Sequence, residues 1–414
     1  MQKRGWGQPM LNPSIPLLTK KTPALIGNLD YRLVPLSKRQ KRFAGRYAVS
    51  PDIDLHRYTT RAVIDWITLG VLLSRPTHFW RIQDEIKTLL GRVPHIINNR
   101  EDSRTADARF DITIQEPEIP IVLNAMALIR TKFGLEMDPV VRSIEISIDF
   151  TPRIPSNIDR AKIVRTLANH LIVRPDVISD INDRPRTTWG IGSKSTMRLI
   201  YHSSRLPDEQ NTEFLISTDR DHAPFSDGTL SIGNKGADLR WRIMDKTRDQ
   251  QNRAAGTFLA LDERSKRARI EVTLDRPEVA SLGVDYLDDL KGLNFNELQG
   301  RYFRFVLPTF SMQTSQPGVR SAIKTWEDRQ RMTKFMKTGV IGLKAMDDAL
   351  AERQKKLRRD VQADLHERGL SLPKVPRIAT GASGSFVAYA DLNERVLTSL
   401  RNLGKRVAAD FATA

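Results

Sequence analysis

The chain has 414 residues, of which 40% are hydrophobic and 28% charged, a composition typical of a globular protein with two or three domains. It contains no cysteine, which excludes disulfides and thiolate metal sites. No stretch approaches the roughly eighteen apolar residues that a membrane helix needs, and the N-terminus lacks the apolar core of a secretory signal. We therefore expect a soluble, cytoplasmic protein without membrane partners.

The formal net charge of +17 is concentrated at the two ends of the chain. Residues 1–50 hold ten lysines and arginines against one acid, and residues 320–369 hold thirteen against eight. Residues 370–414 hold six against three, which leaves the block 51–319 neutral. Basic flanks bind phosphate backbones through counterion release, so this distribution predicts a DNA-binding protein. The alternative is a basic-tailed structural or RNA-interaction protein.

The first 55 residues are rich in proline, glycine and bases and show little periodicity, which predicts a mostly disordered basic arm. Its densest basic cluster, with Phe43 and Tyr47 interleaved, consists of Lys38, Arg39, Lys41, Arg42 and Arg46. Such a mixture can place cations on phosphates and rings on bases. A solvated linker is the competing interpretation.

The central block alternates between patterns of period two and period three to four. Strands are predicted over 62–73, 106–115, 141–150, 197–204, 229–234, 239–246 and 267–274. Helices are predicted over 77–91, 118–134 and 157–171. A glycine-bearing turn at 234–236 makes 229–246 a candidate hairpin. Together these elements predict an α+β fold, a sheet with helices on one face.

The C-terminal third changes to long charged helices, predicted over 319–337, 343–369 and 390–411, with a small-residue linker at 379–385. We therefore divide the chain into a basic arm (1–55), a core (56–310), a charged helical region (311–378), and a linker with a last helix (379–414). Lys355, Lys356 and Arg359 are candidate phosphate contacts on the second helix. A plain solvated helix face would explain them equally well.

Most familiar catalytic motifs are absent. The sequence has no Walker loop, no HExxH and no G-x-S-x-G. Its seven histidines are scattered, so no His-hydrophobe-His nuclease motif occurs.

Three short segments in the predicted hairpin and the strand after it are TLSIG (229–233), RIMDK (242–246) and RIEV (269–272). They resemble a recurrent pattern of the rolling-circle plasmid and phage replication initiation factor family. Asp65-Trp66 is similar to that family's first strand. The resemblance covers roughly residues 60–310 and implies a replication-initiator-like core that recognises an origin and nicks it with a divalent metal.

Strand periodicity identifies candidate metal ligands. Glu145 and Asp149 share the polar face of one predicted strand, and Glu271 shares a face with Arg269 on another. If these strands are neighbours, the carboxylates converge and could hold Mg²⁺ or Mn²⁺. The alternative is cross-strand pairing of the acids with three arginines, namely Arg142, Arg240 and Arg242.

The resemblance fails at one position that matters for catalysis. Met244 stands where the family has a tyrosine, and a thioether cannot attack phosphate. Tyr201 and Tyr302 are the candidate substitutes. We therefore expect a DNA-binding replication initiator of a plasmid, phage or other mobile element, with a host helicase as a further partner and Mg²⁺ or Mn²⁺ as its cofactor if it is catalytic. A non-catalytic sequence-specific regulator, without a cofactor, is the alternative.

The expected DNA contacts on the predicted strands are all basic side chains, namely Arg240, Arg242, Lys246 and Arg269.

Overall fold

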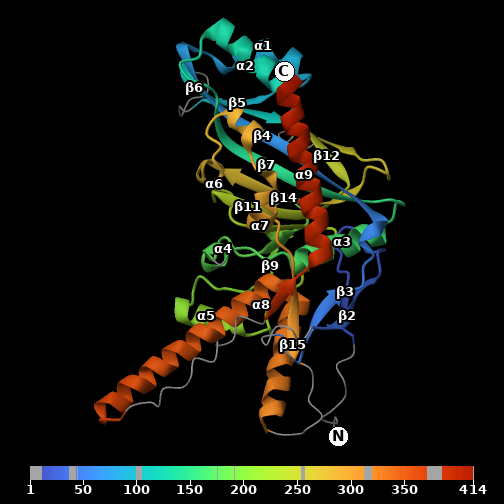
Figure 1. The fold of residues 1–414 in the computed structure, drawn as a ribbon, viewed down its shortest axis with the longest axis vertical. Helices are drawn as coiled ribbons and strands as arrows, with labels where there is room; N and C mark the ends of the chain where they lie inside the picture. Colours follow the sequence, from blue (N-terminus) through green and yellow to red (C-terminus); the bar gives the residue numbers. More distant parts are fainter. Residues whose placement is uncertain are drawn as a thin grey trace.

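The fold is α+β, as predicted (Figure 1). The computed structural model describes residues 12–36, 43, 45–98, 105–174, 176–190, 192–252, 257–311, 319–370 and 385–413. Within these residues, the strands form one sheet of nine strands, one of five and a two-stranded ribbon. None of the helices in the same ranges combines the length and apolar character that a bilayer span requires.

The nine-stranded sheet forms the centre of the molecule, and all its neighbouring strands run antiparallel. Its strands are, in spatial order, β5 (His95–Asn98), β6 (Asp107–Gln115), β4 (Tyr58–Thr77), β7 (Val140–Pro152), β14 (Arg267–Asp275), β11 (Leu239–Lys246), β10 (Thr229–Ile232), β8 (Arg186–Thr188) and β9 (Thr196–Arg198). The predicted hairpin is confirmed, because β10 pairs with β11 across the turn at 234–236.

Helices cover one face of this sheet. Ile146, Val272 and Trp241 lie opposite one another on three adjacent strands and are fully buried on that face. Helix α3 (Asn157–His170) packs against β7, β14 and β11. The Trp241 indole nitrogen donates a 2.7 Å hydrogen bond to the carbonyl of Tyr302, in α7 (Phe295–Tyr302). Burial of such apolar side chains stabilises the layer by about 1.5–3 kcal/mol each.

The C-terminal helix α9 (Ala390–Thr413) belongs to this core, and it crosses in front of the sheet in Figure 1. It packs against α7, β4 and α2 (Ile119–Phe133), which in turn contacts α1 (Phe79–Leu90). The guanidinium of Arg406 hydrogen-bonds to the carbonyl of Ala62. This contact lies on the part of β4 that β6 does not reach, so α9 covers an otherwise open strand edge.

The five-stranded sheet joins strands from the N-terminal and C-terminal parts of the chain. Its order is β1 (Ser14–Pro16), β2 (Asn28–Pro35), β3 (Arg46–Pro51), β15 (Val306–Ser311) and β16 (Phe386–Ala388). The expectation of a mostly disordered arm is therefore wrong for residues 12–36 and 46–51. Leu29, Tyr31 and Val49 are buried in a second core that local periodicity does not reveal. This sheet also crosses our predicted boundaries at 55 and 310.

Helix α8 (Val319–Glu367) merges the two helices predicted at 319–337 and 343–369. Gly339 interrupts it with non-helical φ and ψ of 68° and −164°, a conformation that is essentially restricted to glycine. The two limbs of α8 run in different directions in Figure 1. Arg165 is buried beside the break, and its Nη2 donates a 2.8 Å hydrogen bond to the carbonyl of Met336.

The remaining elements are short. The ribbon of β12 (Arg248–Asn252) and β13 (Thr257–Ala260) connects β11 to β14. The short helices are α4 (Asp176–Ser179), α5 (Asp208–Ile216), α6 (Arg276–Ser281), η2 (Leu55–Arg57), η3 (Ser193–Ser195) and η4 (Leu287–Gly292). The strand predicted over 197–204 is reduced to β9, because the chain leaves the sheet after Arg198. The predicted linker at 379–385 lies, except for Ser385, outside the described residues.

Candidate metal centre on the polar face of the sheet

The face opposite the helices carries polar side chains, and we call it the polar face. Ser147, Glu271 and Arg242 define it, because they lie directly opposite one another on β7, β14 and β11. Directly paired residues of an antiparallel ladder project to the same side of the sheet. The predicted alternation along 141–150 therefore holds, with Glu145 and Asp149 on this face and the isoleucines on the helix-covered face.

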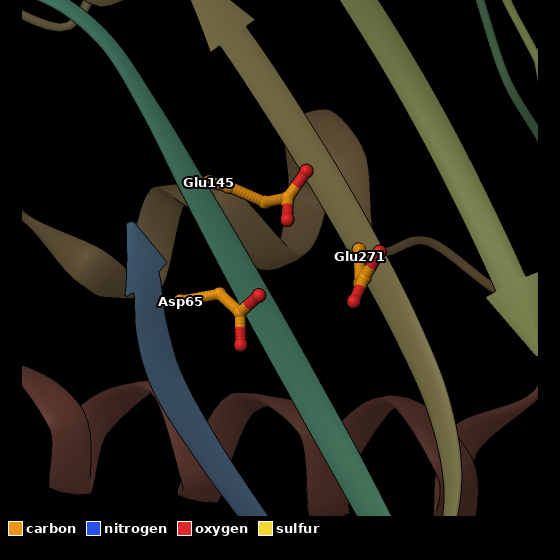
Figure 2. Close-up of side chains that lie close together, drawn as sticks. All are labelled: Asp65, Glu145 and Glu271. Atoms are coloured by element: carbon orange, nitrogen blue, oxygen red, sulfur yellow. The ribbon is translucent and has the colours of Figure 1, made fainter. Parts of the chain in front are cut away.

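Asp65 reaches the polar face through an irregularity in β4. Ile64 pairs with Ile146 and Trp66 pairs with Glu145, so Asp65 is the extra residue of a β-bulge. A bulge bends the strand and redirects the side chain at that point. Figure 2 shows the result: the carboxylates of Asp65, Glu145 and Glu271 turn toward one another, while α9 passes behind the strands.

The three carboxylates form a compact, buried cluster. One oxygen from each of Asp65, Glu145 and Glu271 lies within 4.8 Å of the others. Glu145 and Glu271 are only 1% and 3% exposed. The hydroxyl of Thr273 donates a 2.6 Å hydrogen bond to Glu145. We call these three residues the acidic cluster.

Two arginines partly neutralise the acidic cluster. Arg242 lies 3.0 Å from Glu145 and 2.7 Å from Glu271, and Arg269 pairs with Asp65. Burial by itself would lower the pKa of Arg269, but the carboxylates of Asp149, Asp65 and Glu271 together raise it, so its guanidinium stays charged. The Arg242 side chain is 45% exposed and therefore closes the cluster from the solvent side.

Burial disfavours the charged form of one carboxylate of the cluster, and a neighbouring hydroxyl lacks a hydrogen-bond partner. Burial raises the pKa of Glu271 to about 7 despite the nearby Arg242. The hydroxyl of Ser147, directly opposite Glu271, is buried and has no hydrogen-bond partner. Buried polar atoms are usually satisfied, and here an unsatisfied oxygen lies directly opposite a member of the acidic cluster. Such a set of hard oxygen donors fits Mg²⁺ or Mn²⁺.

Asp149 is not part of the acidic cluster, which corrects the predicted ligand set. Arg269 binds it in a bidentate manner at 2.6 and 2.8 Å, and Arg267 lies 3.0 Å from it. Asp65 takes the expected place of Asp149. Sequence periodicity could not identify Asp65, because the bulge breaks the alternation at that residue, and only the resemblance of Asp65-Trp66 drew attention to it. Of the predicted arginine partners, Arg242 pairs with the acids, whereas Arg142 pairs with Asp111.

Neither candidate tyrosine lies near the acidic cluster. Tyr302 is 1% exposed, and its hydroxyl donates to Glu278, which with burial raises its pKa to about 12. Tyr201 follows β9, four strands from β14, or about 19 Å at the usual strand spacing. Its ring packs against Phe214 and Arg220. These positions do not fit a nucleophile acting at the cluster. Met244, by contrast, lies on the polar face directly opposite Arg269.

Several expected DNA contacts have other roles in the structure. Arg269 is 3% exposed and cannot reach a DNA backbone, and Arg46 donates to Thr309 and so ties β3 to β15. Arg240 donates to the Lys235 carbonyl and Lys246 lies 3.0 Å from Asp249.

The remaining expected contacts divide between an exposed limb and the undescribed part of the chain. Lys355, Lys356 and Arg359 lie on the exposed second limb of α8, where Lys355 is 3.8 Å from Glu352. Lys38, Arg39, Lys41 and Arg42 lie outside the described residues.

An open cavity of about 710 Å³ adjoins the acidic cluster at Asp65. It lies between β4, β14 and α9, and Arg61, Arg267 and Arg406 line it together with acids. This volume is in the range of small-ligand pockets. Solvent and small solutes therefore have access to Asp65.

Comparison with known proteins does not assign this chain to a family. No family model and no curated protein matches this chain. Among solved structures, an aspartate kinase from Synechocystis aligns with 79% of this chain and 59% of its own length, at 13% identity and a TM-score of 0.15. The alignment thus spans less than two thirds of that protein. A TM-score this low gives no information about fold or function.

Proposed function

We propose that this chain is a DNA-binding replication initiation protein. Its acidic cluster would bind a divalent cation, and the protein would nick origin DNA at that site. The carrying observation is that three carboxylates from three adjacent strands converge on the helix-free face of the sheet. The resemblance of residues 229–272 to rolling-circle initiation factors supports the same function. Its partners would be origin DNA and a host helicase, and its compartment the cytoplasm.

Asp65, Glu145 and Glu271 would hold the cation, Mg²⁺ or Mn²⁺. When bound, the ion would polarise the scissile phosphate and offset its developing charge. Among the charged side chains at the acidic cluster, Arg242 is free to move, because its side chain is 45% exposed. A displaced Arg242 could contact a phosphate oxygen. Arg269 is held by Asp149 and would keep the acids in position.

The nucleophile would be water rather than tyrosine. Met244 occupies the position of the family's tyrosine, and both Tyr201 and Tyr302 lie away from the cluster. Attack by water on the phosphorus would break one phosphorus–oxygen ester bond and would leave the protein unattached to DNA. We therefore expect nicked DNA without a covalent protein–DNA adduct.

A non-catalytic regulator is the second candidate. The pairing of Arg242 and Arg269 with the cluster favours it, because the arginines already neutralise much of the acidic charge. In this alternative the polar face binds DNA as an operator reader, with no cation.

A cation-binding experiment and a nicking assay test these candidates together. The thermal midpoint of the full chain is measured with and without 5 mM Mn²⁺ (a concentration on the order of those used to saturate weak sites), for the wild type, Glu271→Gln and the matched control Glu263→Gln. Glu263 is an exposed acid that pairs with Lys266. Supercoiled DNA carrying the chain's own flanking sequence is then incubated with each protein.

If the acidic cluster binds the cation, Mn²⁺ should raise the thermal midpoint of the wild type and of Glu263→Gln. It should leave the thermal midpoint of Glu271→Gln unchanged. Nicking should follow the same pattern. Unchanged midpoints and intact DNA, with DNA binding retained, would establish the regulator instead. A covalent adduct would disprove the water nucleophile.

A further inference from the structure

A line of paired residues crosses the polar face from its edge to the acidic cluster. Arg198 of β9 lies opposite Arg186 of β8, which lies opposite Ser231 of β10. Ser231 lies opposite Arg242 of β11, and Arg242 lies opposite Glu271. Because each pair shares a face, these side chains follow one line across the twisted sheet. We call Arg198, Arg186 and Arg242 the arginine row.

The outer two arginines of this row hydrogen-bond to backbone carbonyls, and Asp183 offsets part of the charge of Arg186. Arg186 donates to the carbonyls of Asn182 and Gly233, and Arg198 donates to the carbonyl of Ile181. Among the described residues, neither forms an ion pair with a carboxylate. Carbonyl acceptors orient the guanidinium groups without cancelling their charge, so the row retains an attraction for anions.

A further arginine, outside the arginine row, adds positive charge at the edge of the sheet. Arg184, just before β8, is 6% exposed, and its Nη1 has no hydrogen-bond partner. Burial and the charge of Arg198 lower the pKa of both Arg184 and Arg186. Like charges around a buried guanidinium nitrogen without a hydrogen-bond partner make this edge of the sheet favourable for an anion.

The neighbouring line on the same face is uncharged. Thr196, Thr188, Thr229 and Met244 lie opposite one another in turn, two residues along each strand from the arginine row. All four are partly exposed, as are Arg186 and Arg198. The face therefore carries one line of positive charge beside one line of methyl groups and a thioether.

We propose that the arginine row binds the phosphodiester backbone of a single DNA strand and leads it to the acidic cluster, with the bases over the threonine and methionine line. From β9 to β11 the row spans about 14 Å, and the path from Arg198 on to Glu271 of β14 spans about 19 Å, which is enough for several nucleotides. A single line of charge fits one backbone, whereas a duplex presents two. The inference rests on the proposed function, since it assumes a DNA substrate.

Fluorescence anisotropy with a labelled 20-nucleotide oligomer tests the row (a length on the order of the site sizes of single-strand binders). The full chain, Arg186→Gln, Arg198→Gln and the control Arg130→Gln are titrated at several salt concentrations, each against the single strand and its duplex. Arg130 lies on α2, is exposed and pairs with Asp138. Thermal midpoints verify that each variant is folded.

Each row variant should bind the single strand about tenfold more weakly, as expected for the loss of a charge-assisted hydrogen bond. The slope of log affinity against log salt should fall by about 0.7 per lost contact. Arg130→Gln should bind like the wild type. Ser231→Arg, which fills the gap in the row, should tighten single-strand binding and increase the slope, and it keeps the inference testable if an arginine variant does not fold.

The possible results distinguish a failure of the inference about the arginine row from a failure of the proposed function. If the Arg186→Gln and Arg198→Gln variants bind the single strand as tightly as Arg130→Gln does, the arginine row is not the binding site. Mn²⁺-dependent nicking in that case would still support the proposed function. A loss of duplex binding with single-strand binding intact would overturn the single-strand assignment. If the wild type binds neither form of DNA, the proposed function fails together with the row.

Discussion

At the scale of single residues, the polar face around the acidic cluster carries buried charges of both signs. Arg269 shows what this arrangement requires, because it contacts Asp149 through two nitrogens and Asp65 through a third. A buried ion pair contributes little net stability compared with an apolar replacement of both partners, but removal of one partner leaves the other charge uncompensated.

We expect Arg269→Met to lower the free energy of unfolding by about 3–5 kcal/mol, because Asp149 and Asp65 lose their counter-charge in a buried place. Urea denaturation followed by circular dichroism measures this change. The matched variant Arg32→Met removes an exposed arginine, 64% accessible, that pairs with Asp52, and it should cost less than about 1 kcal/mol. Equal losses in the two variants would contradict the structural role of Arg269.

His170 gives the chain a predictable response to acid. Its ring is buried among Tyr31, Phe335 and Tyr389, its Nδ1 lies 2.8 Å from the Val306 carbonyl, and burial lowers its pKa to about 4. Between the unfolded pKa of about 6.5 and the folded value, only the unfolded chain binds the proton. The stability that comes from the neutral ring is therefore complete above this window and is lost as the pH falls through it.

In His170→Phe, the pH dependence of the free energy of unfolding between pH 6.5 and 4 should become less steep by up to about 1.4 kcal/mol per pH unit. At pH 8 the variant should be less stable by about 1–3 kcal/mol, since the Val306 carbonyl loses its partner. Denaturation curves at a series of pH values measure both effects. An unchanged slope would mean that the ring also takes up the proton when the chain is folded.

At the scale of elements, two local irregularities decide where functional groups lie. The bulge in β4 brings Asp65 to the acidic cluster, and the break at Gly339 separates the limbs of α8. The break is enforced by packing as well as by φ, because a Cβ at Gly339 would lie 2.8 Å from backbone atoms of Asn169.

We expect Gly339→Ala to destabilise the protein by at least about 2 kcal/mol, from backbone strain and from the contact with Asn169. Gly300 is the control, because it lies inside α7 and a Cβ there meets nothing within 4 Å. Gly300→Ala should stabilise the chain by up to about 1 kcal/mol. Thermal unfolding of the two variants gives opposite shifts if the break depends on glycine, and shifts of the same sign if it does not.

At the scale of the whole molecule, described segments from both the N-terminal and the C-terminal parts of the chain belong to the folded body. The five-stranded sheet places β1 to β3 beside β15 and β16, and α9 lies in the main core. The described strands and helices of the basic flanks are thus attached to the sheets through buried contacts, and the second limb of α8 projects from the body of the molecule (Figure 1).

Leu400→Ala tests this integration, because Leu400 of α9 is fully buried. The substitution should lower the free energy of unfolding by about 2–5 kcal/mol, the usual cost of a cavity in a core. Leu370, which is 58% exposed, provides the control, and Leu370→Ala should change stability by less than about 0.5 kcal/mol. Denaturant titration distinguishes an integral α9 from an appended helix, for which both substitutions would be nearly neutral.

Local pattern alone determined the α+β class, the main strands and helices, the hairpin and the face on which Glu145 and Glu271 lie. These features follow from the backbone periods of two and 3.6, which nearby residues impose. Only the tertiary structure decided that Asp65 replaces Asp149, that Tyr302 lies inside the core, and that β1, β2 and β3 form within the predicted basic arm. Each of these depends on partners distant in the chain, namely Arg269, Glu278 and β15. Such pairings are selected by burial and charge compensation across the whole fold, which no local window of sequence contains.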